Sequence, residues 1–243
     1  MTVRNPMQAW HHRYLSMASS ANTMEAATAK ALLENGVLDL DDSTIGACVW
    51  EYERKGFPYA TDDGLDFCKE LVVSNKRVQS ILKLYFGNAR CYLYHWLRWK
   101  ADPAIECFLK GGSEAGRVAL LIHLLPKGSR LRYSPGSHLH DLPIEEYERS
   151  SYKVEECALE KASLSVENEM FEDGGIVIRD ARLCVSITEG YAIIFGFATE
   201  DLVAGKPKMP LLNLNALKRK VVEMESPGIG VNFAFVNRDG SST

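Results

Sequence analysis

Apolar residues recur every three or four positions in the first third of the chain, as they do along one face of an α-helix. Asn22 stands three residues before Glu25 with the spacing of a capping box, and Gly36 stands where the first helix should end. Asp42 and Ser43 can cap a second helix. The pattern predicts about four helices before residue 89, over AATAKALLENG (26–36), IGACVWEYERK (45–55), LDFCKELVV (65–73) and RVQSILKLYF (77–86).

Beyond residue 89 the pattern changes to short β-branched and aromatic runs separated by glycine, proline and aspartate, which is typical of strands. Evenly spaced runs of this kind favour a closed sandwich or barrel over a parallel α/β sheet. A charged connection, 144–173, is expected to hold one strand of its own, and a helix over 213–224 is expected to lie outside. The predicted strands are 90–99, 117–126, 129–134, 175–180, 182–187, 191–198 and 229–236.

The simplest organisation is one domain over 1–243, mainly β with some α-helix. We expect a helical N-terminal part over 1–88, a β core over 89–198, and a C-terminal helix and strand over 199–243. A composition of 46% hydrophobic and 25% charged residues is typical of a globular protein with a sizeable core. No run approaches the roughly 18 apolar residues of a membrane span, and residues 1–17 lack the apolar segment of a secretory signal. We therefore expect a cytoplasmic protein without a membrane partner.

Charge and cysteine usage narrow the possible partners. The net charge is −4, so no basic stripe is available to neutralise the phosphates of a nucleic acid. The densest basic cluster, 218–220, lies on the predicted late helix and is interpreted as its solvated face. The six cysteines form no CxxC pair, which indicates small buried hydrophobes rather than a zinc site. A small molecule is the expected partner, and a homodimer is compatible with the sequence.

Two stretches carry a family resemblance: LLPKGSRLRYSPGSH (124–138), and FEDGGIVIRDARLCVSI (171–187) after a gap. In order and spacing they resemble the phytanoyl-CoA dioxygenase-like branch of the iron and 2-oxoglutarate oxygenases, over about residues 90–198. The resemblance implies a double-stranded β-helix, a jelly roll of the cupin type, preceded by helices. In that family a His-x-Asp/Glu pair and a distal histidine hold iron, with open positions for 2-oxoglutarate and oxygen.

The iron ligands that the resemblance implies are missing from this sequence. No histidine is followed two positions later by Asp or Glu, and none lies beyond residue 140. The distal ligand falls near Cys184 or Val185, and the first ligand pair corresponds to Lys100 and Asp102, although an ammonium group cannot ligate iron. The 2-oxoglutarate arginine is absent from EGYAIIFGF (189–197). We therefore expect neither a metal nor a cofactor. The six histidines are at positions 11, 12, 95, 123, 138 and 140.

Four residues are candidates for catalysis. His123 is either a core histidine or a general acid/base that faces a cavity, and strand alternation leaves open which face is inside. Tyr133 is either a packed aromatic or a hydrogen-bond donor to a substrate carbonyl. Asp180 and Arg182 are either an ion pair without a role in catalysis or a pocket pair whose guanidinium binds a carboxylate or enolate oxygen.

Further residues are candidates for substrate binding, beginning with His138 of the PGSH turn, which we interpret as a turn or pocket-rim residue. Lys100 and Asp102 admit the same two interpretations as the pair above, and Cys184 stands near the missing ligand position. A metal site made of His123, His138 and His140 is an alternative, since a His-x-His pair with a third imidazole can bind a divalent metal. The aromatic strand CYLYHWLRW either belongs to the core or lines a cavity for a polycyclic ligand.

A chain that resembles this family but lacks its iron ligands and its 2-oxoglutarate arginine is expected to perform non-oxidative chemistry. We expect a metal-independent isomerase or cyclase of natural-product biosynthesis, which acts on a small hydrophobic metabolite by holding a reactive conformer with acid/base assistance. The alternatives are an iron/2-oxoglutarate oxygenase with unconventional ligands and a non-catalytic protein that binds a small molecule.

Overall fold

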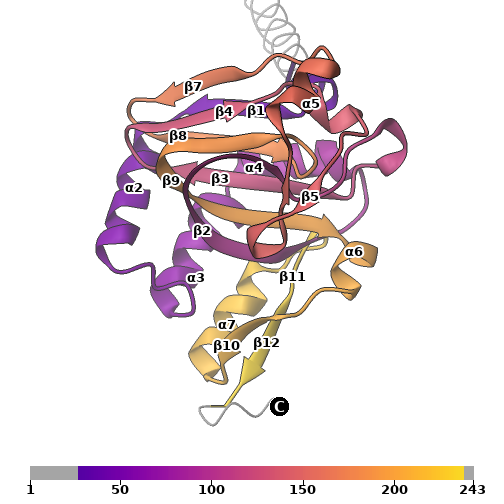
Figure 1. Ribbon diagram of the computed structural model, residues 1–243. Coiled ribbons are helices and arrows are strands. Elements are labelled where there is room, and N and C mark those ends of the chain that lie inside the picture. Colours follow the sequence, from indigo (N-terminus) through magenta and orange to yellow (C-terminus); the bar gives the residue numbers. More distant parts are fainter. Residues whose placement is uncertain (1–26, 238–243) are drawn as a thin grey trace, which may run out of the picture.

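Two layers of antiparallel strands lie face to face and form a double-stranded β-helix (Figure 1). The computed structural model describes residues 27–237, so the Asn22–Glu25 capping box lies outside the described residues. In spatial order, the first layer contains β1 (Val37–Asp41), β8 (Gly175–Asp180), β3 (Ala119–Leu125), β9 (Val185–Thr199) and β2 (Cys91–Cys107). The second layer contains the other halves of β2 and β9, then β4 (Ser129–Tyr133) and β7 (Glu167–Phe171).

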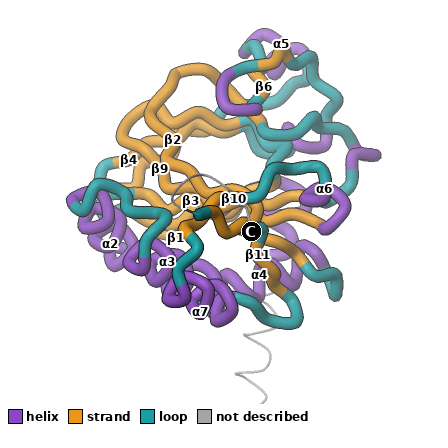
Figure 2. The backbone as a smooth tube through the Cα atoms, turned by 90° about the horizontal axis from the view of Figure 1, so that it is seen from below, coloured by secondary structure: helices purple, strands orange, loops and turns teal. Residues whose placement is uncertain are grey.

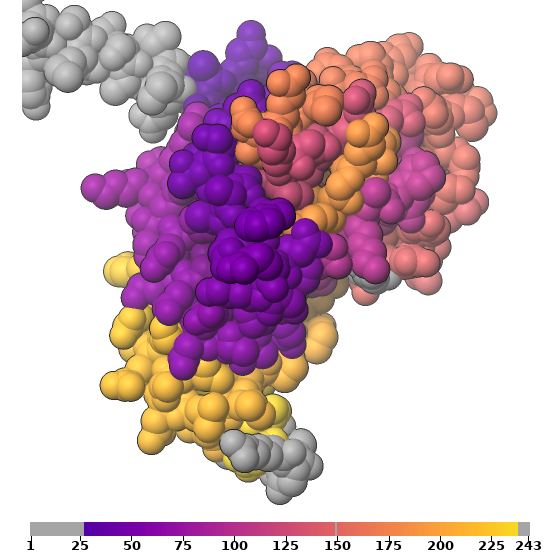
Figure 3. Space-filling model, turned by 90° about the vertical axis from the view of Figure 1, so that its left-hand side faces the viewer, coloured from indigo at the N-terminus to yellow at the C-terminus, as the bar shows by residue number. Residues whose placement is uncertain are grey.

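Helices cover the outer face of the first layer, and their ends are capped largely as the sequence predicts. Asp42 accepts hydrogen bonds from the backbone N–H groups of Thr44 and Ile45, and Gly36 ends the first helical segment at φ +79°. Figure 2 shows α2, α3, α4 and α7 along one side of the strands, and Figure 3 shows the described N-terminal residues, in indigo and purple, spread over one face of the molecule. The helical elements are η1 (Ala31–Asn35), α2 (Ser43–Arg54), α3 (Asp62–Cys68), η2 (Lys69–Val73), α4 (Lys76–Phe86) and α7 (Asn215–Met224).

Alternation along β3 shows which face is inside. Leu120, Ile122 and Leu124 belong to the outer cluster with the helices, whereas Leu121 and Leu125 belong to the cluster between the two layers. His123 shares the inward face with Leu121 and Leu125, because successive side chains of a strand point to opposite faces. Burying one such aliphatic side chain stabilises the fold by about 1.5–3 kcal/mol, so both faces of the first layer contribute.

Four details of the fold differ from the sequence-based expectation. β9 is one strand where two were predicted, because Glu189 pairs with Arg130 of β4 and so bridges the two predicted runs; it begins only at Val185, since residues 181–184 form a turn. The N-terminal part also contains β1, and β2 extends eight residues beyond the predicted end at Trp99, with irregular pairing near Asp102. The 144–173 connection and the C-terminal segment hold more strands than expected.

The remaining elements lie in the connections and at the C-terminal end. β6 pairs antiparallel with the last two residues of β2, and β10 pairs with β12 in a separate parallel ribbon. No helix within residues 27–237 has the length and hydrophobicity that a membrane span requires. These elements are η3 (Ser113–Ala115), η4 (Ser137–Leu139), β5 (Glu145–Glu146), η5 (Glu148–Ser150), β6 (Tyr152–Lys153), α5 (Glu156–Lys161), α6 (Glu200–Ala204), β10 (Met209–Leu212), β11 (Ile229–Val231) and β12 (Phe233–Val236).

The left-handed turn at Gly36 is also a contact site for the PGSH turn. A Cβ atom at Gly36 would lie 2.5 Å from Nδ1 of His138, so the imidazole ring lies directly against this glycine. His138 is 2% exposed, and its Nε2 lies 3.3 Å from the carbonyl oxygen of Leu33. The ring therefore fastens the PGSH turn to the first helical segment.

Replacing Gly36 by alanine is expected to lower the free energy of unfolding by about 2–4 kcal/mol, as left-handed backbone strain adds to overlap with His138. Gly56 is the matched control, since it has the same φ of +79° but a Cβ atom there would meet nothing within 4 Å. Gly56→Ala should cost about 1–2 kcal/mol. Urea unfolding measures both, and His138→Ala in the Gly36→Ala background should recover part of the loss. Equal losses of unfolding free energy for Gly36→Ala and Gly56→Ala would contradict a close contact between Gly36 and His138.

Candidate functional site

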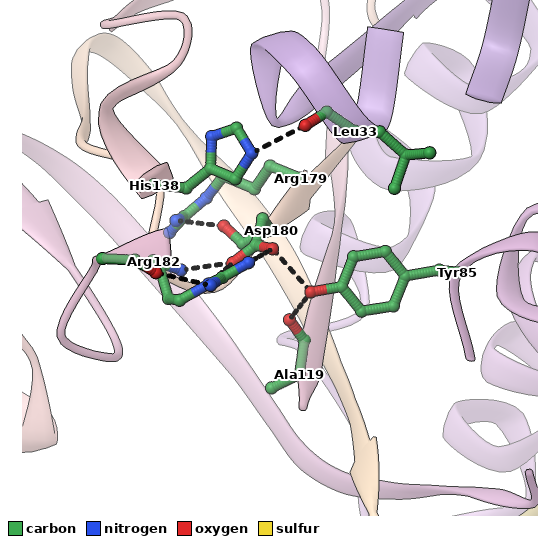
Figure 4. A network of polar contacts seen from close by, with 8 residues as sticks. Leu33, Tyr85, Ala119, His138, Arg179, Asp180 and Arg182 are labelled. Atoms are coloured by element: carbon green, nitrogen blue, oxygen red, sulfur yellow. Dashed lines mark hydrogen bonds and ion pairs between the residues drawn. The ribbon is translucent and has the colours of Figure 1, made fainter. Parts of the chain in front are cut away.

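The side chain of Asp180 is the centre of a buried polar network (Figure 4). One carboxylate oxygen accepts hydrogen bonds from the backbone N–H of Arg182 at 2.9 Å and from its Nε at 2.8 Å. The other accepts from Nη2 of Arg182 and from the Tyr85 hydroxyl, both at 2.6 Å. Hydrogen bonding to Asp180 raises the pKa of Arg182, and burial followed by the Asp180 charge raises that of Tyr85.

The network joins four parts of the chain. Tyr85 comes from α4, and its hydroxyl also lies 3.1 Å from the carbonyl oxygen of Ala119 on β3. The backbone N–H of Asp180 donates to the carbonyl oxygen of Gly36 at 2.8 Å. Asp180 and Arg182 thus lie together, but protein donors occupy both carboxylate oxygens. Their predicted role in catalysis has no support in this geometry.

Arg179, on the opposite face of β8 from Asp180, points between the two layers and is fully buried. Its Nε donates to Nε2 of His123 at 3.0 Å, and its Nη1 donates to the carbonyl oxygen of Leu183 at 2.9 Å. The guanidinium lies 5.5 Å from the ring centroid of Phe108. Its Nη2 has no hydrogen-bond partner in the part of the chain that the structure describes.

Arg179 remains a cation inside the β-helix. Burial lowers its pKa to about 10, and the nearby Glu106 and cysteine side chains oppose that shift. Burial, with the charge of Arg179, holds the pKa of His123 well below its usual range, so the imidazole is neutral. His123 is 1% exposed and accepts at Nε2, which places its proton on Nδ1. His123 is therefore a buried partner of Arg179 in this conformation.

The sequence analysis missed Arg179, although a signal for it was present. In GIVIRD the buried Val177 faces inward and the two isoleucines face the helices. Alternation then predicts that Arg179 points inward with Val177. An arginine on the inner face of an otherwise apolar strand is unusual, because isolated charges are costly to bury.

Glu106 on β2 lies opposite Val185 of β9 and also points inward, since its neighbours Ile105 and Cys107 belong to an outer cluster. It is 3% exposed and accepts a hydrogen bond from the Ser151 hydroxyl at 2.5 Å. Burial raises its pKa to about 7. The interior thus contains a carboxyl group that gains a proton close to neutral pH.

These residues do not fit an iron centre. Of the two candidate positions for the distal ligand, Val185 faces inward and has no donor atom, whereas Cys184 faces outward and packs with Cys107. Glu106 and His123 point inward, but Nε2 of His123 is occupied by Arg179, whose positive charge repels a metal ion. Within residues 27–237, no three His, Cys, Asp or Glu side chains are grouped as metal ligands.

The other predicted residues are dispersed. Lys100 pairs with Tyr191 of β9, whereas Cys184 precedes Val185, the residue opposite Glu106. Lys100 and Asp102 line a cavity of about 210 Å³ with Glu106, and Cys184 is not among the residues that line it.

Tyr133, the remaining catalytic candidate, is 5% exposed, and its hydroxyl lies 3.4 Å from Asp39. Burial, followed by the Asp39 charge, raises its pKa. His138 packs on Gly36 and His140 is exposed, while His123 faces Arg179, so the three imidazoles form no common site.

An aromatic pocket of about 430 Å³ opens beside this interior. The pairing of β2 with β9 shifts register between Leu93 and His95, which is why the successive residues Tyr94 and His95 both line it. The strand CYLYHWLRW thus lines a cavity as well as the core. We call it the aromatic pocket, and its lining comprises Tyr59, Tyr94, His95, Trp96, Phe108, Leu109, Ser150, Lys206, Pro207, Lys208, Met209 and Pro210.

His95 belongs to the strand CYLYHWLRW, but the sequence analysis gave this histidine no role of its own. Burial, followed by the charge of Lys206, lowers its pKa to about 4, so the ring is neutral at physiological pH. Its Nε2 is buried and has no hydrogen-bond partner among residues 27–237. A histidine within an aromatic run, next to a strand irregularity, was the only sequence signal for it.

The raised pKa of Glu106 predicts a pH-dependent stability. The folded state binds this proton more tightly than the unfolded chain, so the stabilisation is complete below pH 4.5 and is lost as the pH rises through 7. Glu106→Gln cannot titrate and should remove a decline of about 2–3 kcal/mol in unfolding free energy over that range. Urea unfolding at several pH values measures it, with the exposed Glu200→Gln as control. Identical pH profiles for wild type and Glu106→Gln would contradict the assignment.

No family model and no curated protein matches this chain. Among solved structures, the non-heme alpha-ketoglutarate-dependent epimerase SnoN from nogalamycin biosynthesis is 11% identical, with a TM-score of 0.51 over 73% of this chain and 84% of SnoN. AviO1 from Streptomyces viridochromogenes Tue57 is 13% identical, with a TM-score of 0.46 over 72% of this chain and 95% of AviO1. EctD from S. alaskensis, solved with 2-oxoglutarate and 5-hydroxyectoine, is 12% identical, with a TM-score of 0.47 over 72% of this chain and 76% of EctD. The likeness to SnoN confirms the mainly β, double-stranded β-helix fold.

Proposed function

We propose that this chain is a metal-independent enzyme that isomerises or cyclises a small hydrophobic metabolite in natural-product biosynthesis. The observation that carries the proposal is Arg179, a fully buried guanidinium bound to His123 between the two layers of the β-helix. The fixed positive charge of Arg179 disfavours a metal cation beside it, and Val185, the inward-facing candidate for the distal ligand, offers no ligand atom.

The aromatic pocket is the proposed active site. Its volume is within the range of small-molecule sites, and its walls are mostly apolar with a few polar groups. Burial raises the pKa of Tyr94 to about 12, so its hydroxyl keeps the proton and can donate to a substrate oxygen. His95 offers a neutral nitrogen at Nε2.

Holding the substrate in a reactive conformer supplies most of the proposed rate enhancement. A group with a pKa of about 4, such as His95, is a weak base at neutral pH, so proton abstraction contributes little. Enclosure between aromatic rings fixes the relative positions of the reacting atoms, an effect that can lower a barrier by several kcal/mol. Tyr94 and His95 then orient the substrate by hydrogen bonds. Catalysis that depends on positioning the substrate, with little proton transfer, suits a cyclisation or an isomerisation without change of oxidation state.

SnoN gives the proposal its biosynthetic setting, since it is an epimerase from nogalamycin biosynthesis with the same fold. SnoN is alpha-ketoglutarate dependent, and one of its structures contains Fe3+. The present chain differs at that point, because its interior contains Arg179 and lacks a grouped ligand set within the described residues.

The test is the metal content of the purified, untagged protein by plasma mass spectrometry, with calorimetric titration of iron(II) and 2-oxoglutarate. We expect substoichiometric metal and no joint binding, because the Arg179 cation opposes a metal ion. EctD, which has been solved with bound Fe, is the positive control. Stoichiometric iron or iron-dependent binding of 2-oxoglutarate would overturn the proposal and favour an oxygenase with unconventional ligands.

A further inference from the structure

The walls of the aromatic pocket suit a flat ring system. Tyr59 and Trp96 meet edge to face with centroids 5.8 Å apart, and His95 meets Phe108 in the same manner at 5.8 Å. Tyr59 comes from the loop after α2, His95 and Trp96 come from β2, and Phe108 directly follows β2. Aromatic side chains bind other aromatic rings through stacked and edge-to-face contacts. The volume of about 430 Å³ is large enough for a ligand of two or three fused rings.

The rim of the pocket is positively charged. Lys206 and Lys208 are exposed and have no ion-pair partner within residues 27–237, and no carboxylate lines the pocket. Some exposed lysines are neutralised by a neighbouring carboxylate, as Lys55 is by Asp63 and Lys69 by Glu223. At the pocket rim two lysines stand two residues apart without such a carboxylate, so this edge of the pocket is cationic although the chain has a net charge of −4.

The lysines are held at the rim by a restrained backbone. They alternate with Pro207 and Pro210 in the segment 206–210, and each proline fixes its own φ angle. The backbone N–H of Met209 donates to the carbonyl oxygen of Asn232 at 2.9 Å. Lys206 and His95 line the same pocket, and the Lys206 charge contributes to the lowered pKa of the imidazole.

We propose that the aromatic pocket binds an aromatic or polycyclic monocarboxylate, with its rings between the aromatic walls and its carboxylate at Lys206 and Lys208. This inference names the substrate class of the proposed enzyme. Its catalytic role rests on the proposed function, whereas binding of the ligand does not. One anionic group matches the rim, whereas the apolar walls disfavour a ligand charged at both ends. Nε2 of His95 is available to bond a hydroxyl or carbonyl group of the ring system.

The test compares two probes that differ only in charge, 2-naphthoate and 2-naphthamide, by isothermal titration at low ionic strength with EDTA present. We expect the carboxylate to bind about fivefold or more tightly than the amide, since each exposed ion pair contributes modestly. The Lys206→Gln/Lys208→Gln variant should bind both probes equally. The matched control is Lys76→Gln/Lys83→Gln, which removes two exposed lysines of α4 outside the pocket and should keep the preference.

A second variant tests the location of the rings. Tyr59 is 39% exposed, so Tyr59→Ala should fold normally and weaken both probes several-fold without changing their ratio. Equal wild-type affinities, a preference that survives loss of both rim lysines, no binding of either probe, or no effect of Tyr59→Ala would each overturn the inference. Because EDTA is present and no turnover is measured, these outcomes are independent of the metal test of the proposed function.

Discussion

The arrangement of helices and strands depends on the hydrogen bonds and the ion pair that the buried carboxylate of Asp180 forms. A buried charge is tolerated only when its partners compensate for lost hydration, and here Arg182 and Tyr85 occupy both oxygens. Through these bonds one side chain fixes α4, the end of β8 and the turn before β9, and its backbone N–H fixes the Gly36 turn. Removing Arg182 would leave an uncompensated charge in the core, and removing Tyr85 would take one donor from the carboxylate and its link to α4.

The same strand end determines what lies inside the β-helix. Because successive residues point to opposite faces, the orientation of Asp180 toward Tyr85 directs Arg179 between the layers. The guanidinium is stabilised there by His123, by a backbone carbonyl and by the face of Phe108. The centre is thus filled by a cation and packed side chains, and space for a ligand lies beside it, between Phe108 and the C-terminal segment.

Local features of the fold were predictable from the sequence. Asp42 caps α2 and Gly36 ends the first helical segment because these roles depend on neighbouring residues alone. The strands of the core follow from alternation, but the continuity of β9 does not, because it depends on pairing with β2, β3 and β4. The double-stranded β-helix came from a family resemblance and is confirmed.

The candidate site was less predictable, because its parts are distant in the sequence. The aromatic pocket combines Tyr59, the middle of β2 and the segment 206–210, which no local pattern connects. Of the predicted residues, Asp180 and Arg182 proved to form an ion pair, whereas Lys100 lines a cavity that does not include Cys184. Arg179 could have been found from alternation along β8, but its bond to His123 required the pairing of β8 with β3.

The segment 206–210 contributes no strand to the β-helix, since β10 pairs only with β12. Met209 packs against the helix-side core, but the side chains of Lys206 and Lys208 are exposed and can change without disturbing the register of β2 or β9 or the buried charges between the layers. Natural variation at these two positions is separable from folding, so one core can evolve toward new ligands by exchanging residues at its edge. Divergence of specificity among proteins built on this core would then be fastest at Lys206 and Lys208 and slowest at Arg179 and Asp180.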